Sequence, residues 1–440
     1  MSLDSQQTDQ RPISGQNDLF EYFRLGERPA RMVGLEHEKL IYPVDGALPV
    51  PYEGRRGIAA VLAGFERFGW KPVREAPDKP VIAAARGNAT LSLEPGGQFE
   101  LSGTPYATAA QAHRENLAHL DELKQVCAPL GLRVVALGYR PFETVTSMPW
   151  MPKTRYTAMR QTLGTRGKLA LEMMLMTATG QVSLDFGDEA DCARKVTLVA
   201  RASPLLVALF ANSPLRQGAD SGFLSYRSHV WSDVDPSRCG YQAFFLDGSF
   251  SYAKYVEWAL AAPMLFLRRG GKYLTPPLTF GQFIERGFEN ERAVQEDWSD
   301  HLSTLFPEVR VKKLIEVRAA DCNGVEMTGG LAAMMRGLMY SPDALERALA
   351  FLPKLPLAEH LEFHELAQRE GLEAKWNGQS LAAMTVELLK VAREGLAKLG
   401  DDEPALLDAL DVVAKGGRSP ARRVLEAPRS PTALLDAFTL

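Results

Sequence analysis

Acidic residues alternate with apolar residues in several short segments of this chain, and this pattern constrains its fold more than any other feature. In a β-strand, residues i and i+2 point to the same face of the sheet. In the segment GLEHEKLI, Glu36 and Glu38 therefore share one face and His37 lies on the other. The pattern predicts a strand with one acidic face.

The segment TLSLEPGGQFELSG predicts a β-hairpin. Leu91 and Leu93 alternate with polar residues before the turn sequence at 95–97, which contains one proline and two glycines. The alternation then resumes on the return strand. This geometry brings Glu94 and Glu100 to one surface.

Two further segments are predicted to be strands with polar faces. In GQVSLDF, the polar face carries Gln181, Ser183 and Asp185. In EVRVKKLIEVRAAD, we expect one strand whose apolar face carries Val309, Val311, Lys313, Ile315 and Val317. Its polar face carries Glu308, Arg310, Lys312, Glu316 and Arg318.

Clustered carboxylates need a compensating charge. Two carboxylates about 4 Å apart repel by about 4 kcal/mol at an effective dielectric constant near 20. Divalent metal ions, or arginine and lysine partners, would relieve this repulsion. Acidic residues outnumber basic ones on the four faces, which favours hard cations with oxygen ligands, and Mg²⁺ typically binds together with substrate phosphates. Alternatively, the faces belong to separate edge strands with ordinary surface charge, but their recurrence on four strands favours one shared site.

Helical patterns separate these strands and dominate the C-terminal part of the chain. We expect helices over residues 106–128, 168–176 and 189–211, and an amphipathic helix over residues 384–400 that ends at a glycine. A short helix is expected after residue 18, with Asp18 as its N-cap. The predicted fold is α+β: a large antiparallel β-sheet flanked by helices, with a helical C-terminal subdomain. We predict a disordered tail at 1–17, a catalytic domain at 18–328, and a helical subdomain packed on it at 329–440.

Composition and charge exclude several classes of protein. The chain has 50 basic and 54 acidic residues, a net charge of −4, so bulk charge gives no reason to expect nucleic-acid binding. We find no secretory signal and no apolar run long enough for a membrane helix, so no membrane partner is expected. The four cysteines are too scattered for a disulfide framework, which predicts a reducing, cytoplasmic location.

Seven motifs occur in an order that resembles a known family. They are GLEHEKLIYP, SLEPGGQFELSGTP, MPKTRY, QVSLDFGDEAD, ALFANSPL, GFLSYRSHVWSD and FPEVRVKKLIEVRAAD. Together they resemble the plant and proteobacterial type of glutamate–cysteine ligase, within the glutamine synthetase-like superfamily. The resemblance implies a glutamine synthetase-like catalytic core over residues 18–328.

The resemblance implies an ATP-dependent ligase that joins L-glutamate to L-cysteine through a γ-glutamyl phosphate, the first step of glutathione synthesis. ATP and Mg²⁺ are the implied cofactors, and a monomer or homodimer is expected. As metal ligands it indicates Glu36, Glu38, Glu94, Glu100 and Glu316. For contacts with phosphate it indicates Arg310, Lys312 and Arg318. For the amino-acid pocket it indicates Arg155, Tyr156, Arg227 and Trp231.

Departures from the family pattern leave alternatives open. Met176 and Ser183 differ from the residues that are common in the family, so a glutamate ligase with a different acceptor amine is an alternative. A guanidino phosphotransferase with the same core fold is a more distant one, and a non-catalytic relative is a third. His360 and His364 lie four residues apart on an expected helix, but no third metal ligand accompanies them, which favours an ordinary helical face.

Overall fold

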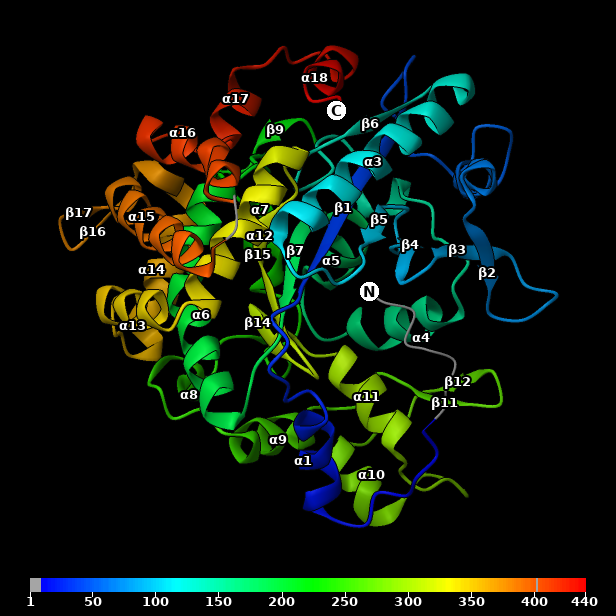
Figure 1. Cartoon of the computed structure of the whole chain (residues 1–440). Coiled ribbons are helices and arrows are strands. Elements are labelled where there is room, and N and C mark those ends of the chain that lie inside the picture. Colours follow the sequence, from blue (N-terminus) through cyan, green and yellow to red (C-terminus); the bar gives the residue numbers. More distant parts are fainter. Residues whose placement is uncertain (1–8, 401–402) are drawn as a thin grey trace.

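A large antiparallel sheet forms the centre of the molecule (Figure 1). The computed structural model describes residues 9–400 and 403–440. Within these residues the sheet has the order β14-β15-β7-β1-β5-β4-β3-β2, and β6 pairs with the second half of β1. Its strands are β1 (Val33–Pro43), β2 (Lys71–Arg74), β3 (Val81–Arg86), β4 (Ala89–Leu93), β5 (Phe99–Ser102), β6 (Leu132–Val135), β7 (Thr179–Leu184), β14 (Val309–Val311) and β15 (Ile315–Asp321).

Short two-stranded sheets lie in the loops outside this main sheet. They pair β8 (Leu215–Arg216) with β9 (Ala219–Asp220), β10 (Cys239–Gly240) with β13 (Phe306–Pro307), β11 (Leu267–Arg269) with β12 (Lys272–Leu274), and β16 (Lys375–Trp376) with β17 (Gln379–Ser380). The helices before residue 325 are α1 (Gln16–Arg24), α2 (Ile58–Gly64), α3 (Ala109–Cys127), α4 (Thr154–Leu163), α5 (Ala170–Met176), α6 (Glu189–Phe210), α7 (Tyr226–Trp231), α8 (Ala243–Leu246), α9 (Tyr252–Ala261), α10 (Phe280–Arg286) and α11 (Gln295–Ser303).

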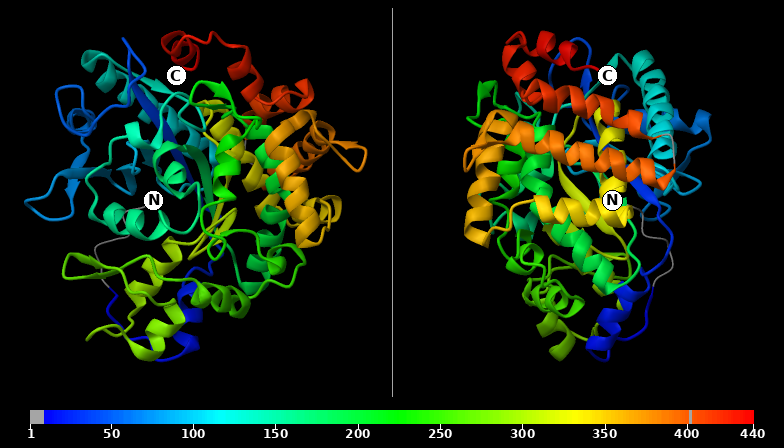
Figure 2. Two further views of the ribbon diagram at one scale, coloured as in Figure 1. Left: turned by 180° about the vertical axis from the view of Figure 1, so that it is seen from behind. Right: turned by 60° about the vertical axis from the view of Figure 1, so that its left-hand side comes forward.

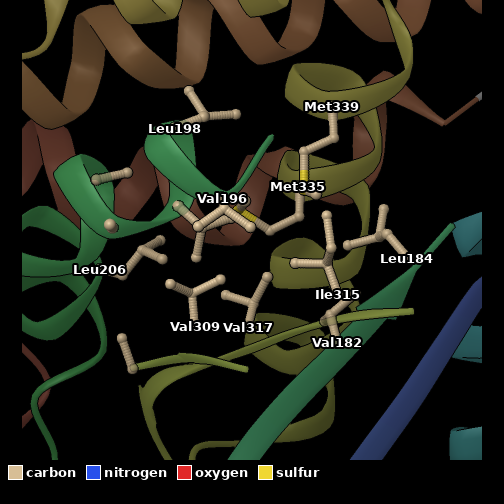
Figure 3. Close-up of a cluster of buried hydrophobic side chains, with 14 of the residues drawn as sticks. Val182, Leu184, Val196, Leu198, Leu206, Val309, Ile315, Val317, Met335 and Met339 are labelled. Atoms are coloured by element: carbon tan, nitrogen blue, oxygen red, sulfur yellow. The ribbon is translucent and has the colours of Figure 1, made fainter. Parts of the chain in front are cut away.

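One face of the sheet is covered by α3, α6 and α12 (Val325–Tyr340) (Figure 1). The apolar residues of the alternating strands, such as Val182, Leu184 and Val317, pack there against Val196 of α6 and Met335 of α12 (Figure 3). Each fully buried side chain of this kind stabilises the fold by about 1.5–3 kcal/mol. The apolar half of the alternation therefore forms the core, as the sequence predicts.

Helices α13 to α16 form a layer outside α6 and α12 (Figure 2). Their bounds are α13 (Pro342–Phe351), α14 (Leu357–Glu370), α15 (Leu381–Leu399) and α16 (Asp408–Gly416). The last two helices, α17 (Ala421–Glu426) and α18 (Pro431–Ala437), pack instead against the end of the sheet where β6 pairs with β1. The expected amphipathic helix is α15, and Gly400 ends it in the left-handed conformation with φ +83°. The predicted boundary at 328/329 falls inside α12, which packs against both the sheet and α15. The division into two domains stays a prediction.

The N-terminal segment differs from its expected form. Residues 1–8 of the predicted tail lie outside the described residues, and in the described part Ile13 donates a backbone hydrogen bond to Ala293. Asp18 is not the N-cap of α1, because the helix begins two residues earlier. Its carboxylate instead accepts hydrogen bonds from the backbone of Ser14 and Gly15, ahead of the helix.

The last acidic segment is a hairpin rather than one continuous strand. β14 pairs with β15 so that Arg310 lies opposite Glu316, and the chain turns at residues 312–314. Lys313 is therefore exposed in the turn and does not share the apolar face. β15 also contains a β-bulge between Val317 and Ala320, where it slips by one residue against β7.

A membrane span is not found among the described helices, since none of them combines the length and the apolar character that a bilayer crossing requires.

Candidate active site

A cavity lies on the face of the sheet opposite α3 and α12. Its charged side chains come from strands β1, β5, β14 and β15, from the turn between β4 and β5, and from α7. Strand β7 contributes uncharged polar side chains, and α4, α5 and α7 contribute most of the apolar ones. Its lining consists of Glu36, Glu38, Glu94, Pro95, Gln98, Glu100, Tyr156, Met159, Met173, Met174, Thr177, Thr179, Gln181, Arg227, Trp231, Phe306, Arg310 and Arg318.

Most of the residues that the sequence singles out line this one cavity. They are Glu36, Glu38, Glu94, Glu100, Tyr156, Arg227, Trp231, Arg310 and Arg318. Three do not belong to its lining, namely Arg155, Lys312 and Glu316. Segments nearly 300 residues apart in the chain therefore meet at one place. The roles expected of these residues stay predictions, because geometry alone does not assign them.

Strand register places the glutamates. Glu38 lies directly opposite Glu100 in the β1–β5 pair, and side chains of such a pair share a face with Cβ atoms about 5 Å apart. The backbone amide of Thr179 donates to Glu38 Oε2 at 2.9 Å, and Ser92 Oγ donates to Glu100 Oε2 at 2.5 Å. Neutral donors thus orient both carboxylates.

Glu94 sits in the turn between β4 and β5. Gly97 closes the turn with φ +81°, and its backbone amide donates to the Glu94 carbonyl at 2.9 Å. At Gly96 a Cβ atom would lie 2.1 Å from the carbonyl oxygen of Leu175, so only glycine lets this turn approach α5. The two glycines of the turn therefore bring the acidic hairpin against the helix that supplies Met173 and Met174.

Burial and mutual repulsion shift the pKa values of these carboxylates. Burial raises the pKa of Glu38 well above its usual value, and the charges of Glu100 and Glu94 raise it further. Burial and the charge of Glu100 likewise raise the pKa of Glu94. Burial also raises the pKa of Glu36, to which Glu100 and Glu316 add. A nearby cation would favour the charged form of all three.

Glu316 has a different environment, because cations surround it. Its carboxylate pairs with Arg310 Nη2 at 2.5 Å and Lys312 Nζ at 3.1 Å, and Arg318 Nη1 lies 3.4 Å away. Burial alone would raise the pKa of Glu316, but these three cations outweigh it and hold the pKa below the usual value. These contacts favour a role for Glu316 in holding the arginines.

Three of the predicted pocket residues line the cavity and one does not. Arg227 has its guanidinium carbon 5.8 Å from the ring centre of Trp231, and the guanidinium carbon of Arg318 lies 5.7 Å from the same ring. Tyr156 lines the cavity, although its hydroxyl donates to the carbonyl of Leu93. Arg155 instead has its guanidinium carbon 5.5 Å from the ring of Phe266.

The donor set fits Mg²⁺ in its chemistry. Glu36, Glu38, Glu94 and Glu100 offer hard carboxylate oxygens that lie close together in one cavity. In residues 9–400 and 403–440, no group of three or more His, Cys, Asp or Glu side chains is arranged to hold a metal ion. Mg²⁺ does not need such a group, since it usually binds through one or two carboxylates, water and substrate phosphates.

Several lining residues were missed by the sequence reasoning. Gln98 Nε2 donates to the carbonyls of Met174 and Thr177, which joins the acidic hairpin to α5. Gln181 Oε1 accepts from Arg318 Nη1 at 2.6 Å. Both lie on the predicted polar faces, so the alternation that selected the glutamates also pointed to them. The sequence pattern gave no indication of Met173, because strand alternation does not predict where a helix packs against the sheet.

His364 proves to be structural. It is buried on α14, where its ring nitrogens lie 3.1 Å from Ser228 Oγ and 2.9 Å from the Tyr241 hydroxyl. Burial lowers its pKa to about 4, which is typical of a neutral histidine in a hydrogen-bond network. His360 is also buried, and neither residue belongs to the cavity lining.

Comparison with known proteins supplies independent information. Residues 32–433 match glutamate–cysteine ligase family 2. A chloroplastic glutamate–cysteine ligase of Arabidopsis thaliana is 38% identical over 416 residues, which cover 93% of this chain and 79% of the relative. Chloroplastic glutamate–cysteine ligase B of Oryza sativa subsp. japonica is 36% identical over 414 residues, which cover 93% of this chain and 83% of the relative.

A solved structure has the same fold. The glutamate–cysteine ligase of Francisella tularensis in complex with AMP superposes with a TM-score of 0.56 at 12% identity, covering 94% of this chain and 88% of that one. This likeness supports the predicted α+β fold, in which helices flank a large antiparallel sheet.

The relatives contradict the predicted cytoplasmic location, because they are chloroplastic enzymes. Few and scattered cysteines are typical of any reducing compartment, so cysteine content could not distinguish one such compartment from another.

Proposed function

The chain belongs to glutamate–cysteine ligase family 2, and from this premise we propose that it joins the γ-carboxylate of L-glutamate to the amine of L-cysteine at the expense of ATP. The observation that carries the proposal is the convergence of four glutamates, two buried and two partly buried, and three arginines in one cavity. Surface charge on separate strands would not produce this arrangement.

The proposed reaction has two steps. A γ-carboxylate oxygen of glutamate attacks the γ-phosphorus of ATP, the bond to the bridging oxygen breaks, and ADP leaves. The cysteine amine then attacks the carbonyl carbon of the acyl phosphate. The carbon–oxygen bond breaks, inorganic phosphate leaves with its electron pair, and the nitrogen loses a proton to give the amide.

Arg318 and Arg310 are suited to different parts of this task. Arg318 lines the cavity, and Gln181 and Glu316 hold its Nη1. A guanidinium held in this way can stabilise charge on a transferring phosphoryl group with little reorganisation. Arg310 donates to the carbonyls of Ser303 and Leu305 as well as to Glu316, so most of its donors are already used. We assign it the role of fixing Glu316.

Arg227 and Trp231 form the part of the cavity best suited to an amino acid. The Arg227 guanidinium can bind a carboxylate, and the Trp231 ring beside it offers an apolar surface. Met159, Met173 and Met174 extend this surface. A short apolar or thiol side chain would fit such a wall better than a charged one.

Glu36, Glu38, Glu94 and Glu100 are the residues that would hold Mg²⁺. When bound, the ion would neutralise polyphosphate charge and orient the γ-phosphoryl group. The carboxylates themselves keep the site acidic and orient its donors, since they accept hydrogen bonds from Thr179, Ser92 and Ser102.

The test is to identify the product. Purified protein is incubated with ATP, Mg²⁺, L-glutamate and either L-cysteine or one of a panel of other amines, and the products are read by mass spectrometry together with phosphate release. We expect γ-glutamylcysteine and one phosphate per amide. Faster amide formation with another amine would assign a different acceptor. A stable phosphorylated guanidine without an amide would contradict ligase chemistry altogether.

A further inference from the structure

Asp321 is a buried carboxylate at the end of β15 that the proposed reaction does not use. It is 2% exposed, and its neighbours are donors. Its Oδ2 accepts from the backbone amide of Asn212 at 2.8 Å and from Ser213 Oγ at 2.6 Å. Its Oδ1 accepts from Ser225 Oγ at 2.8 Å, and Arg227 Nη1 lies 3.9 Å from the same oxygen. Burial raises the pKa of Asp321, and these contacts oppose that effect by favouring its charged form.

The β-bulge in β15 places Asp321 beside the cavity. Strict alternation from Arg318 would put Asp321 on the core face of the sheet. The one-residue slip between Val317 and Ala320 reverses the alternation, and Asp321 pairs instead with Thr179, which lines the cavity. Residues directly opposite in an antiparallel pair share a face. Asp321 and Arg318 therefore lie on the same side.

Two serines connect Asp321 to α7. Each gives its only hydroxyl proton to the carboxylate, so its lone pairs are available to backbone amides of the helix. Ser225 Oγ caps the helix by accepting from the amide of Ser228 at 3.2 Å. Ser213 Oγ accepts from the amide of Arg227 at 3.0 Å. Asp321 thus sets the position of the first turn of α7, which carries Arg227.

The side chain of Arg227 is held from the same direction. Its Nη1 faces Asp321, and its Nη2 donates to the carbonyl of Arg318 at 2.9 Å. Its buried Nε has no hydrogen-bond partner within the described part of the chain. A donor is therefore left for a bound molecule in the cavity that Arg227 lines.

We infer that Asp321 is a positioning residue: it orients Arg227, through α7 and by direct attraction, to bind an anionic oxygen group of a substrate. The group is a carboxylate of an amino acid or a phosphate of ATP. This inference rests on the proposed function for its choice of substrates.

The test uses Asp321→Asn, which keeps the shape but removes the charge and turns one acceptor into a donor facing other donors. We expect the KM of the substrate that Arg227 binds to rise at least tenfold, with kcat changed less than threefold. A raised KM for glutamate or cysteine assigns a carboxylate, and a raised KM for ATP assigns a phosphate. In combination with Arg227→Lys, the second change should add little, because both act on one contact.

Asp235→Asn is the matched control. Asp235 is another buried carboxylate, held by Arg238 and Ser237, and it is not part of the cavity lining. This variant should melt at a lower temperature without any change in the three KM values. Should Asp321→Asn fail to fold, Ser225→Ala keeps the carboxylate and should raise the same KM two- to fivefold.

A crystal structure of Asp321→Asn separates this inference from the proposed function. A displaced Arg227 guanidinium supports the inference whichever amine is the acceptor. An unmoved Arg227, or three unchanged KM values with only a lower melting temperature, would overturn it. Failure of the wild-type protein to form γ-glutamylcysteine would count against the proposed function and leave the position of Arg227 as the deciding measurement.

Discussion

The two faces of the central sheet are built from the same strands but obey opposite rules. On the face under α6 and α12, Leu184 and Val317 are almost fully buried among other apolar side chains. On the cavity face, Glu38 lies opposite Glu100, and like charges in such a pair are destabilising. One alternation therefore encodes a face that stabilises the fold and a face that lowers its stability.

In these strands, the residues that stabilise the fold and the residues that line the cavity alternate along the chain. Substitutions at odd and even positions of one strand should affect different measurements. The cavity face is tolerated because neutral donors and the Arg310–Glu316 pair orient its charges, and because a cation can offset the remainder. The following changes would break or sharpen this separation.

The largest effect is expected from Glu38→Gln. We expect kcat/KM to fall at least about 100-fold, because a charged ligand facing the cavity is lost. The free energy of unfolding should stay equal or rise, since repulsion with Glu100 is relieved. Steady-state kinetics and urea denaturation of the same preparation check both parts. Normal activity of this variant at low Mg²⁺ concentration would contradict the proposed role of Glu38 as a metal ligand.

The matching change on the core face is Leu184→Ala. Leu184 is 1% exposed, and its truncation should lower the free energy of unfolding by about 2–5 kcal/mol. The KM values of the protein that remains folded should be unchanged. Urea denaturation gives the first quantity and kinetics well below the melting temperature give the second. A KM change as large as that of a cavity-face variant would show that the two faces are not separate.

Addition of Mg²⁺ should stabilise the wild-type protein. A ligand at 100 times its Kd raises the free energy of unfolding by about 2.7 kcal/mol. The rise in melting temperature should persist in Leu184→Ala and be largely lost in Glu38→Gln. Sodium chloride at equal ionic strength is the control. An equal rise with sodium would assign the effect to screening.

The smallest effect is expected from Asp235→Asn, at a carboxylate that is already paired. Burial alone would raise the pKa of Asp235, but hydrogen bonds from Arg238 and Ser237 lower it below its ordinary value of 3.8. The charged form therefore stabilises the fold above that value, and this contribution disappears as the pH falls through the lowered native pKa. The variant should be about 1–3 kcal/mol less stable at pH 7. Urea denaturation at pH 7 and in acid should show this gap closing, and a constant gap would contradict the assignment.

Much of the cavity face could be predicted from sequence because alternation is a local property. The two-residue period of a strand is enough to predict that Glu36 and Glu38 share one face and that His37 lies on the other. The hairpin that carries Glu94 and Glu100 was also local, since its turn residues are adjacent. Family resemblance then supplied the chemistry that the faces serve.

Non-local features could not be predicted in this way. Arg155 was expected in the pocket, but helix α4 turns it toward Phe266. Lys313 was predicted to lie on the apolar face because the alternation of apolar and polar residues continues through residues 312–314. The chain turns there, and the sequence pattern gives no sign of that turn. The role of Asp321 was hidden because a bulge leaves no signature in the pattern of apolar residues.

The bulge in β15 makes the orientation of the following residues depend on the exact number of residues between positions 317 and 321. Loss of one residue there would restore regular pairing with β7 and turn every later side chain of the strand over. Asn323, which precedes α12 and whose Nδ2 donates to the carbonyl of Phe210 at 2.8 Å, would then be displaced from this contact. Length variation between homologous chains is thus expected in loops and termini, whereas insertions and deletions between residues 317 and 321 should be selected against.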